Sequence, residues 1–385
     1  MNTINTPDLV CFSHLRWDFV YQRPQHLMTR FAAQYRVIFI EEPVYHGDDI
    51  GYNATAIPSN IIRVVPHLPQ GLTPAESLAE MKQLLRQIFD ELQIESYFFW
   101  YYTPMALAVS EDYNPLMIVY DCMDELSAFK FAPQELKDRE KELMSKADIV
   151  FTGGHSLYES KKHLHHNIHP FPSSIDVEHF YKARYYTEDP DDQLHIPHPR
   201  IGFYGVIDER MDIALIDSIA RRKPEWHFVL IGPVVKIDEN DLPRLPNIHY
   251  LKKKEYQDLP SYISGWDIAM LPFAHNESTR FISPTKTPEY LAAGKPVIST
   301  PIIDVIRHYG ANKLVHIAGT ADEFIRVAAL ELGTRDRKEW LAQVNDLLSK
   351  NSWDKTWQQM MHLMEVQLTS KINPVITKPR ENAYV

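Results

Sequence analysis

The amino-acid sequence predicts an α/β protein with two Rossmann-like, doubly wound domains that face each other across a cleft. Short runs rich in Val, Ile, Phe and Tyr alternate with longer amphipathic segments along nearly all of the 385 residues. Several of these runs are apolar throughout, which is typical of parallel strands buried on both faces. The alternation forms two series, separated by the polar, proline-containing stretch 183–199, and each series has the length of one domain.

The first series predicts a Rossmann-like domain over residues 1–182. Its strand candidates are the apolar runs 8–14, 36–42, 61–67, 97–102, 116–122 and 148–154. The helix candidates between them lie near 24–34, 74–93, 133–146 and 156–165. Pro24 and Pro133 suit the first turns of their helices, because proline lacks the N–H group that is unpaired there.

The second series predicts a second Rossmann-like domain over residues 183–352. Its strand candidates are 200–205, 227–233, 248–252, 268–273, 296–302 and 314–318. Its helix candidates lie near 212–222, 255–264, 286–293, 321–332 and 336–349. The tail WDKTWQQMMHLMEVQLT then carries apolar residues at helical spacing. We expect a helix over 353–370 that crosses back and joins the first domain.

Composition and charge exclude several classes of protein. The net charge of −11 disfavours nucleic-acid binding through a basic face. Cys11 and Cys122, the two cysteines, lie in apolar runs, so we expect no disulfide and a reducing compartment. No apolar run reaches the roughly 18 residues of a spanning helix. We expect a cytoplasmic protein, and the apolar stretch 68–78 leaves open a peripheral contact with the inner face of the membrane.

The densest group of polar residues is the segment NESTRFISPTKTPEYLAAGKPVIST. A polar loop leads there into a helix start, where unpaired N–H groups and the helix dipole suit a phosphate. Arg280 and Lys286 flank that start and can neutralise a diphosphate. Glu289 lies three residues after Lys286 and projects from the same helical face. The alternative is a capped helix with a solvated ion pair. Two further hydroxyl donors are Ser283 and Thr285.

The pattern P-x-K-x-x-E-Y-L-A-A-G-K-P-V-I-S-T at 284–300 resembles the donor-binding segment of GT-B glycosyltransferases. It is most similar to the family-four-like bacterial enzymes of capsule, exopolysaccharide and wall-polymer assembly. The resemblance covers nearly the whole chain, because further similar segments follow in the family's order. They are SHLRWDFVYQRPQH (13–26), YDCMDE (120–125), IDVEHF (175–180), GFYGVIDERMD (202–212), LPSYISGWDIAMLPF (259–273) and SWDKTW (352–357).

The resemblance implies that the second domain binds a nucleotide-diphosphate sugar. Gly205 would let the diphosphate approach the backbone, Arg210 and Lys286 would bind it, and Glu289 would bind the ribose. The nucleotide base would lie against residues around Tyr250 and Leu251. One position departs from the family: many members have an acidic sugar contact eight residues before the ribose glutamate, where this chain has Phe281. Recognition of the sugar and the retaining mechanism are therefore not implied.

The first domain is expected to bind the acceptor. An inverting transfer needs a base that takes the proton of the acceptor hydroxyl. Asp124 is the first candidate, because related inverting enzymes resemble this segment and have their acidic base there. His14 and Asp18 are the competing candidates. The alternative for Asp124 is a helix cap or an ion pair, and a retaining enzyme would need no such base.

The loop WDFVYQRPQH at 17–26 separates the first strand candidate from the first helix candidate. We interpret it as an acceptor-binding and closure surface, with Trp17 as a sugar platform and Arg23 as a polar contact. The alternative is that both residues brace the loop. His155 opens a later helix and is a further candidate for acceptor binding, with a solvent-facing histidine as its alternative.

Taken together, the sequence predicts a glycosyltransferase that moves a sugar from a nucleotide-diphosphate sugar to a glycan or lipid-linked acceptor in bacterial surface polysaccharide assembly. Uridine diphosphate is the favoured nucleotide and guanosine diphosphate the second choice. No cofactor and no metal are expected, since the acidic run 189–192 lies in the linker as solvated charges. The alternatives are a nucleotide-sugar epimerase of the same architecture and a non-catalytic subunit that binds nucleotide or glycan. A dehydrogenase is the weakest alternative, because neither series has a G-x-G-x-x-G turn.

Overall fold

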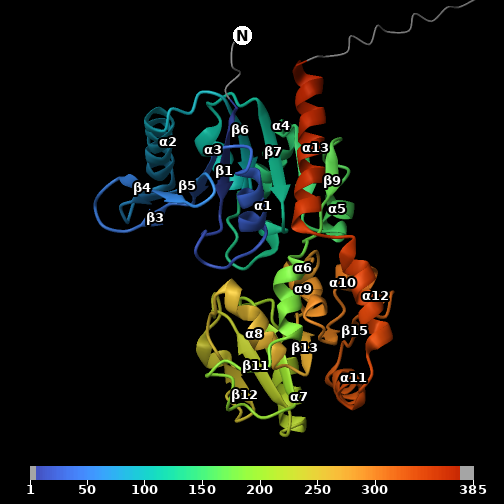
Figure 1. Cartoon of the computed structure of the whole chain (residues 1–385). Coiled ribbons are helices and arrows are strands. Elements are labelled where there is room, and N and C mark those ends of the chain that lie inside the picture. Colours follow the sequence, from blue (N-terminus) through green and yellow to red (C-terminus); the bar gives the residue numbers. More distant parts are fainter. Residues whose placement is uncertain (1–5, 373–385) are drawn as a thin grey trace, which may run out of the picture.

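The computed structural model describes residues 6–372 of the chain. Two largely parallel sheets form its framework, one in each half of the chain, and they lie one above the other in Figure 1. Side chains alternate between the two faces of each sheet and enter a separate hydrophobic core on each face. The predicted class, an α/β protein with two Rossmann-like halves, is confirmed.

The first sheet has the strand order β3-β5-β2-β1-β6-β7-β8-β9, and all pairs along this path are parallel. The strands on this path are β1 (Asp8–Ser13), β2 (Val37–Glu41), β3 (Val44–Tyr45), β5 (Ile61–Leu68), β6 (Tyr97–Tyr101), β7 (Met117–Cys122), β8 (Ile149–Thr152) and β9 (Ile168–Pro170). Strand β4 (Gly51–Ile57) pairs antiparallel with β5 at the margin of the sheet. The order changes direction between β1 and β6, which is where doubly wound sheets bind ligands.

The second sheet is wholly parallel and has the order β12-β11-β10-β13-β14-β15. Its strands are β10 (Arg200–Tyr204), β11 (His227–Ile231), β12 (Ile248–Tyr250), β13 (Ile268–Leu271), β14 (Val297–Ser299) and β15 (His316–Ile317). Here the order changes direction between β10 and β13. The loops after these two strands, like those after β1 and β6, are therefore placed to form a site.

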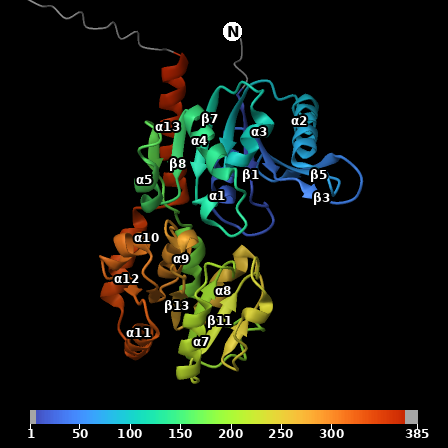
Figure 2. The same ribbon diagram turned by 180° about the vertical axis from the view of Figure 1, so that it is seen from behind.

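Helices cover both faces of each sheet (Figures 1 and 2). Those of the first half are α1 (Arg23–Phe31), α2 (Pro74–Glu91), α3 (Leu107–Ser110), α4 (Leu136–Lys146), α5 (His155–Lys161) and α6 (Val177–Tyr181). Those that follow are α7 (Ile213–Arg222), α8 (Leu259–Ser264), α9 (Lys286–Ala292), α10 (Ile303–Val305), α11 (Ala321–Gly333), α12 (Lys338–Ser349) and α13 (Trp353–Ile372).

Helix α13 crosses from the second half back to the first and runs along the first sheet (Figure 1). Its buried residues Trp353, Met360, Met361 and Met364 belong to the same core as residues of β1 and α1. The expected crossing helix is thus present. Conversely, Phe180 of α6 is fully buried in a core of the second sheet, although it precedes residue 183. The domain limits 1–182 and 183–352 stay a prediction.

The polar stretch 183–199 packs against the second sheet. Gln193 is fully buried and donates a hydrogen bond to the Tyr262 carbonyl (2.9 Å), while its side-chain oxygen accepts one from the Trp266 indole (3.0 Å). Asp189 pairs with the buried Arg200 guanidinium at 2.7 Å. The expectation of solvated charges is therefore wrong for Asp189, because a buried arginine needs this partner.

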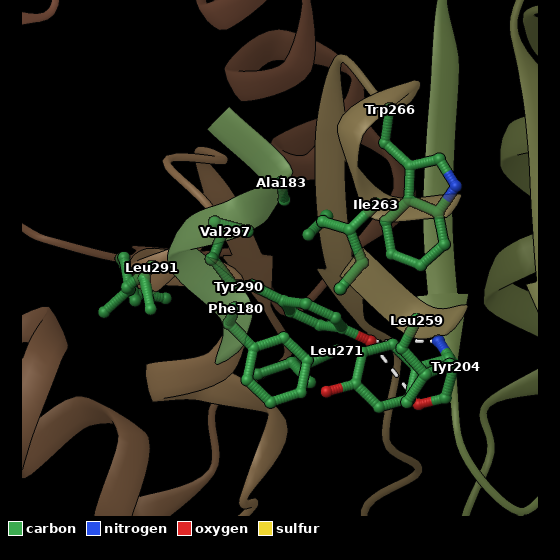
Figure 3. Close-up of a cluster of buried hydrophobic side chains, with 14 of the residues drawn as sticks. Phe180, Ala183, Tyr204, Leu259, Ile263, Trp266, Leu271, Tyr290, Leu291 and Val297 are labelled. Carbon is green, nitrogen blue, oxygen red and sulfur yellow. Dashed lines mark hydrogen bonds between the residues drawn. The ribbon is translucent and has the colours of Figure 1, made fainter. Parts of the chain in front are cut away.

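A core of the second half fixes α9 against β10 (Figure 3). The Tyr290 hydroxyl accepts a hydrogen bond from the Tyr204 backbone N–H at 2.9 Å, and both rings are buried. Leu291 and Val297 complete the contact between helix and sheet. The start of α9 is thereby held beside the end of β10, and the candidate site lies there.

Candidate active site

A cavity of about 1110 Å³ lies between the two halves of the molecule. Strand-end loops of both sheets line it, as expected from the places where the strand orders reverse. The first half contributes residues 17–22 together with His26 and Arg30 of α1. The second half contributes, among others, Gly205, Gly232, residues 253–257 and the start of α9. The cavity is large enough for a nucleotide sugar.

Two glycines and a lysine form one wall of the cavity. Gly205 follows β10 with φ +144°, and Gly232 follows β11 with φ +149°. A Cβ on Gly205 would collide with Cε of Lys286, and one on Gly232 with the Gly205 carbonyl. The wall therefore consists of bare backbone next to an ammonium group, and a phosphate can approach it closely.

Lys286 and Glu289 both lie in the first turn of α9 and line the cavity. Burial lowers the pKa of Lys286, and the neighbouring Glu289 carboxylate opposes this shift. Burial also raises the pKa of Glu289 to about 7. The Tyr204 hydroxyl donates a hydrogen bond to that carboxylate. A cation and a hydrogen-bonding carboxylate thus stand one turn apart beside the bare backbone.

Arg210 is fixed in the loop after β10. Its guanidinium pairs with the buried Asp208 carboxylate at 2.7 Å. It also lies 5.3 Å from the centre of the Phe129 ring, which comes from the first half of the chain. The positive charge is thereby held at the junction of the two sheets, and it acts on Lys286 and on Asp124.

Asp124 follows β7 and is not among the residues that line the cavity, but the charges of these cations act on its carboxyl. Burial raises the pKa of its carboxyl to about 6, while Arg210, Arg23 and Lys286 oppose this shift. A group with such a pKa is ionised in part near neutral pH and can accept a proton in catalysis. The neighbouring carboxylate of Glu125 forms an ion pair with the Lys161 ammonium at 2.8 Å. Of the two carboxylates, Asp124 is the one on which the charges of Arg210, Arg23 and Lys286 act.

His14 and Asp18 are less suited to accept a proton. Burial lowers the pKa of His14 to about 4, so its imidazole is a weaker base than the Asp124 carboxylate. Asp18 does line the cavity, but its exposed carboxylate forms an ion pair with Arg63. The structure therefore favours Asp124 among the three candidates. The catalytic role itself stays a prediction.

Residues 198–332 match the family model described as "Glycosyl transferases group 1". This range contains the whole second sheet with Arg210, Lys286 and Glu289. A Bacillus subtilis (strain 168) protein assigned as teichuronic acid biosynthesis glycosyltransferase TuaH is 24% identical over 287 residues, which are 70% of this chain and 72% of that protein.

Solved structures of similar fold cover almost the whole chain. Sucrose-phosphate synthase from Thermosynechococcus elongatus has a TM-score of 0.70 at 14% identity over 94% of this chain and 100% of its own. Anabaena HepE in complex with UDP and glucose has a TM-score of 0.65 at 14% identity, over 93% and 99%. The E. coli trehalose-6-phosphate structure bound with UDP-2-fluoro glucose has 0.66 at 11% identity, over 92% and 98%.

The chain is a glycosyltransferase with the GT-B fold. The sequence prediction of this class is confirmed.

Several predicted donor contacts of the glycosyltransferase lie away from the cavity. Arg280 is 60% exposed and pairs with the exposed Glu277 at 3.7 Å, and it does not line the cavity. Ser283 lies instead beside Gly154 of the first half. Thr285 does line the cavity. The predicted donor contacts of Arg280 and Ser283 are therefore not supported.

The predicted base contacts also need correction. The Tyr250 hydroxyl donates a hydrogen bond to the Pro243 carbonyl, and Arg244 lies over its ring. Leu251 packs against a hydrophobic core. Neither residue lines the cavity, whereas residues 253–257, which follow a left-handed turn at Lys252 (φ +57°), do line it. The contact of a nucleotide base with residues around Tyr250 and Leu251 is therefore not supported.

Arg23 does not reach the cavity. Its guanidinium is 1% exposed and forms three hydrogen bonds with Asp121 and one with the Phe171 carbonyl. The interpretation of Arg23 as an acceptor contact is therefore wrong, and the alternative of a bracing residue holds. Trp17 lines the cavity while the edge of its ring packs on Phe39 at 5.0 Å.

His155 and Phe281 lie at contacts between the two halves of the molecule. The His155 ring stands 4.8 Å from the ring of His308, next to a hydrogen bond from the Ser156 N–H to Asp304 (3.0 Å). An acceptor contact of His155 is therefore not supported. Phe281 packs against the core of the first sheet. This packing accounts for an apolar residue where the family has an acidic one.

Sequence reasoning missed Tyr256 as a cavity residue. The Tyr256 ring lines the cavity together with Tyr21, and the two ring centres are 4.7 Å apart, although they come from opposite halves of the chain. Tyr21 belongs to the loop that the sequence already placed at the cleft, as an aromatic residue available for stacking. Tyr256 lies in a run of charged residues, and nothing in that run distinguishes it from a solvated turn.

Proposed function

We propose that this glycosyltransferase transfers a sugar from a nucleotide-diphosphate sugar to a glycan or lipid-linked acceptor in the assembly of a bacterial surface polymer. UDP is the favoured nucleotide. The observation that carries the proposal is the first turn of α9, where Lys286 and Glu289 face the backbone of Gly205 and Gly232 across one cavity.

This arrangement suits the chemistry of the transfer. Departure of a nucleoside diphosphate leaves negative charge on the leaving group, and Lys286, Arg210 and the start of α9 provide positive charge beside it. Asp124 lies among the same cations and can take the proton of an acceptor hydroxyl. The residues therefore supply both requirements of an inverting transfer, and we propose that no metal is needed.

The named relatives support the choice of substrates. Two structures of similar fold hold UDP or a UDP-sugar analogue, and the Bacillus relative is assigned to teichuronic acid biosynthesis. None of the described helices is long and apolar enough to cross a membrane.

The proposal is tested by incubating the protein with a panel of UDP-sugars and GDP-sugars and measuring binding by calorimetry. We expect one nucleotide to bind, and Lys286→Ala to weaken its binding about tenfold or more because a charged contact to the diphosphate is lost. Lys350→Ala is the matched control, since Lys350 lies at the exposed end of α12. The proposal fails when neither UDP nor GDP binds.

The same panel separates the alternative functions. An epimerase would change the free sugar nucleotide without any acceptor, whereas the proposed transfer requires one. A non-catalytic subunit would bind the nucleotide without converting any sugar nucleotide. The observation behind this alternative is Phe281, which stands in the place of an acidic sugar contact. Release of nucleoside diphosphate only when glycan extracts are added would favour the transferase.

A further inference from the structure

We infer that residues 17–22 of the first half form the nucleobase side of the donor site, with Tyr21 and Tyr256 as an aromatic wall contributed by both halves. The inference rests on the proposed function, since it takes a nucleotide sugar as the ligand. It assigns to this loop a place beside the nucleotide, although the sequence suggested a surface for the acceptor.

The groups that line the cavity form two sets. In the first set, Cε of Lys286 lies beside the backbone of Gly205, and Glu289, one turn later on α9, accepts a hydrogen bond from the Tyr204 hydroxyl. In the second set, Asp176 accepts a hydrogen bond from the His179 N–H at 3.1 Å, and the His179 ring stacks on Tyr256 at 4.3 Å.

These two sets give a direction to a bound nucleotide. With the diphosphate at Lys286 and Gly205 and the ribose at Glu289, the base extends toward the second set, which contains Tyr256 and Asp176. The Tyr256 hydroxyl is buried and has no hydrogen-bond partner among residues 6–372.

The first half closes this end of the cavity with aromatic rings. The Tyr21 ring lies 4.7 Å from the Tyr256 ring at an angle of 31°, and His26 lies 5.5 Å from Tyr256. The His179 ring also stacks on Tyr256, with the ring centres 4.3 Å apart. Tyr21 is 38% exposed and faces the cavity. A planar base can stack on such a wall.

The loop that carries Tyr21 is held in place before any ligand binds. The Gln25 side chain donates hydrogen bonds to the carbonyls of Trp17 (2.7 Å) and Val20 (3.0 Å). The Trp17 N–H donates to the buried Glu41 carboxylate at 2.9 Å. The ammonium of Lys253 in the second half donates to the Asp18 carbonyl at 2.9 Å. Such a fixed loop gives a ligand-binding wall at little entropic cost.

The test uses the full chain and calorimetric titration with three probes: UDP, UMP and inorganic pyrophosphate. We expect Tyr21→Ala to raise the Kd of UDP and of UMP about tenfold, which corresponds to the loss of one stacked base. The Kd of pyrophosphate should stay unchanged. Tyr21→Phe keeps the ring and should bind all three probes like the wild type. Tyr45→Ala, an exposed tyrosine of the same half that lies outside this cavity, is the control.

Thermal unfolding of each variant confirms that it is folded. Equal binding of UDP to the wild type and to Tyr21→Ala overturns the inference and leaves the proposed function standing. An equal loss of UMP and pyrophosphate also overturns it, because the loop would then act on the whole cleft. A wild type that binds neither UDP nor GDP contradicts the proposed function and the inference with it. When GDP binds in preference, GDP and GMP replace the uridine probes.

Discussion

Burial raises the pKa of the Asp124 carboxyl to about 6, while the charges of Arg210, Arg23 and Lys286 oppose this shift. Because a base acts in its ionised form, the transfer rate should rise between pH 5 and pH 7 and then level off. Asp124→Asn should lower kcat by about 10²- to 10⁴-fold and leave the Kd of UDP almost unchanged. Initial rates with the accepted donor across this pH range provide the measurement. An unchanged kcat would exclude Asp124 as the base.

A second residue, Glu289, should make the binding of UDP depend on pH. Its raised pKa of about 7 means that the carboxylate, which accepts hydrogen bonds from ribose hydroxyls, forms as the pH rises through 7. Binding of UDP should therefore tighten between pH 6 and pH 8. The neighbouring groups are Lys286, Tyr204 and Asp176. Calorimetry at several pH values should show this trend in the wild type and lose it in Glu289→Gln, whereas an identical trend in both would assign it to another group.

At the scale of elements, helix α1 is anchored by one buried ion pair. Arg23 and Asp121 are 1% and 0% exposed, and removal of either partner leaves a buried charge unpaired. Arg23→Met should lower the free energy of unfolding by about 3–5 kcal/mol. The pair of Arg221, which is exposed, and Asp217 serves as control, and Arg221→Met should lower the free energy of unfolding far less than Arg23→Met, because solvent screens an exposed charge. Urea unfolding followed by circular dichroism measures both, and equal losses would contradict the anchoring role.

The sequence predicts the central elements well because their signal is local. Strands such as β1 and β10 are buried on both faces and therefore apolar throughout. Strand β4 was not predicted, since it is half-exposed and pairs at the sheet margin. The structural role of Arg23 could not be predicted from the sequence either, because its partner Asp121 is 98 residues away. A polar residue in a loop gives no indication of whether such a distant partner exists.

In the candidate site, too, residues with a local sequence signal were predictable and those that depend on distant contacts were not. Lys286 and Glu289 were predictable, because a helix start, a cation and a carboxylate lie within a few residues of one another. The proposed role of the loop 17–22 in binding the nucleotide base was not, because it depends on how the two halves face each other. That arrangement is set by distant contacts such as α13 against α1, and no local pattern encodes it.

At the scale of the whole molecule, helix α13 joins the two halves. Trp353 is 1% exposed and its ring stacks on His26 at 4.6 Å. Trp353→Ala should lower the free energy of unfolding by about 3–5 kcal/mol, because it leaves a cavity in the core next to the donor site. Val366→Ala, at an exposed position of the same helix, should stay within about 0.5 kcal/mol. Denaturant unfolding compares the two, and a small loss for Trp353→Ala would mean that the first core forms without this helix.

We propose that a nucleotide-diphosphate sugar binds between the two halves with its diphosphate at the start of α9, and a crystal structure of the protein with bound UDP is the decisive measurement. We expect the diphosphate beside Lys286 and Gly205, the ribose on Glu289 and the base against Tyr21 and Tyr256. A nucleotide bound elsewhere, or in the reverse direction with its base near Asp124, would overturn this proposal.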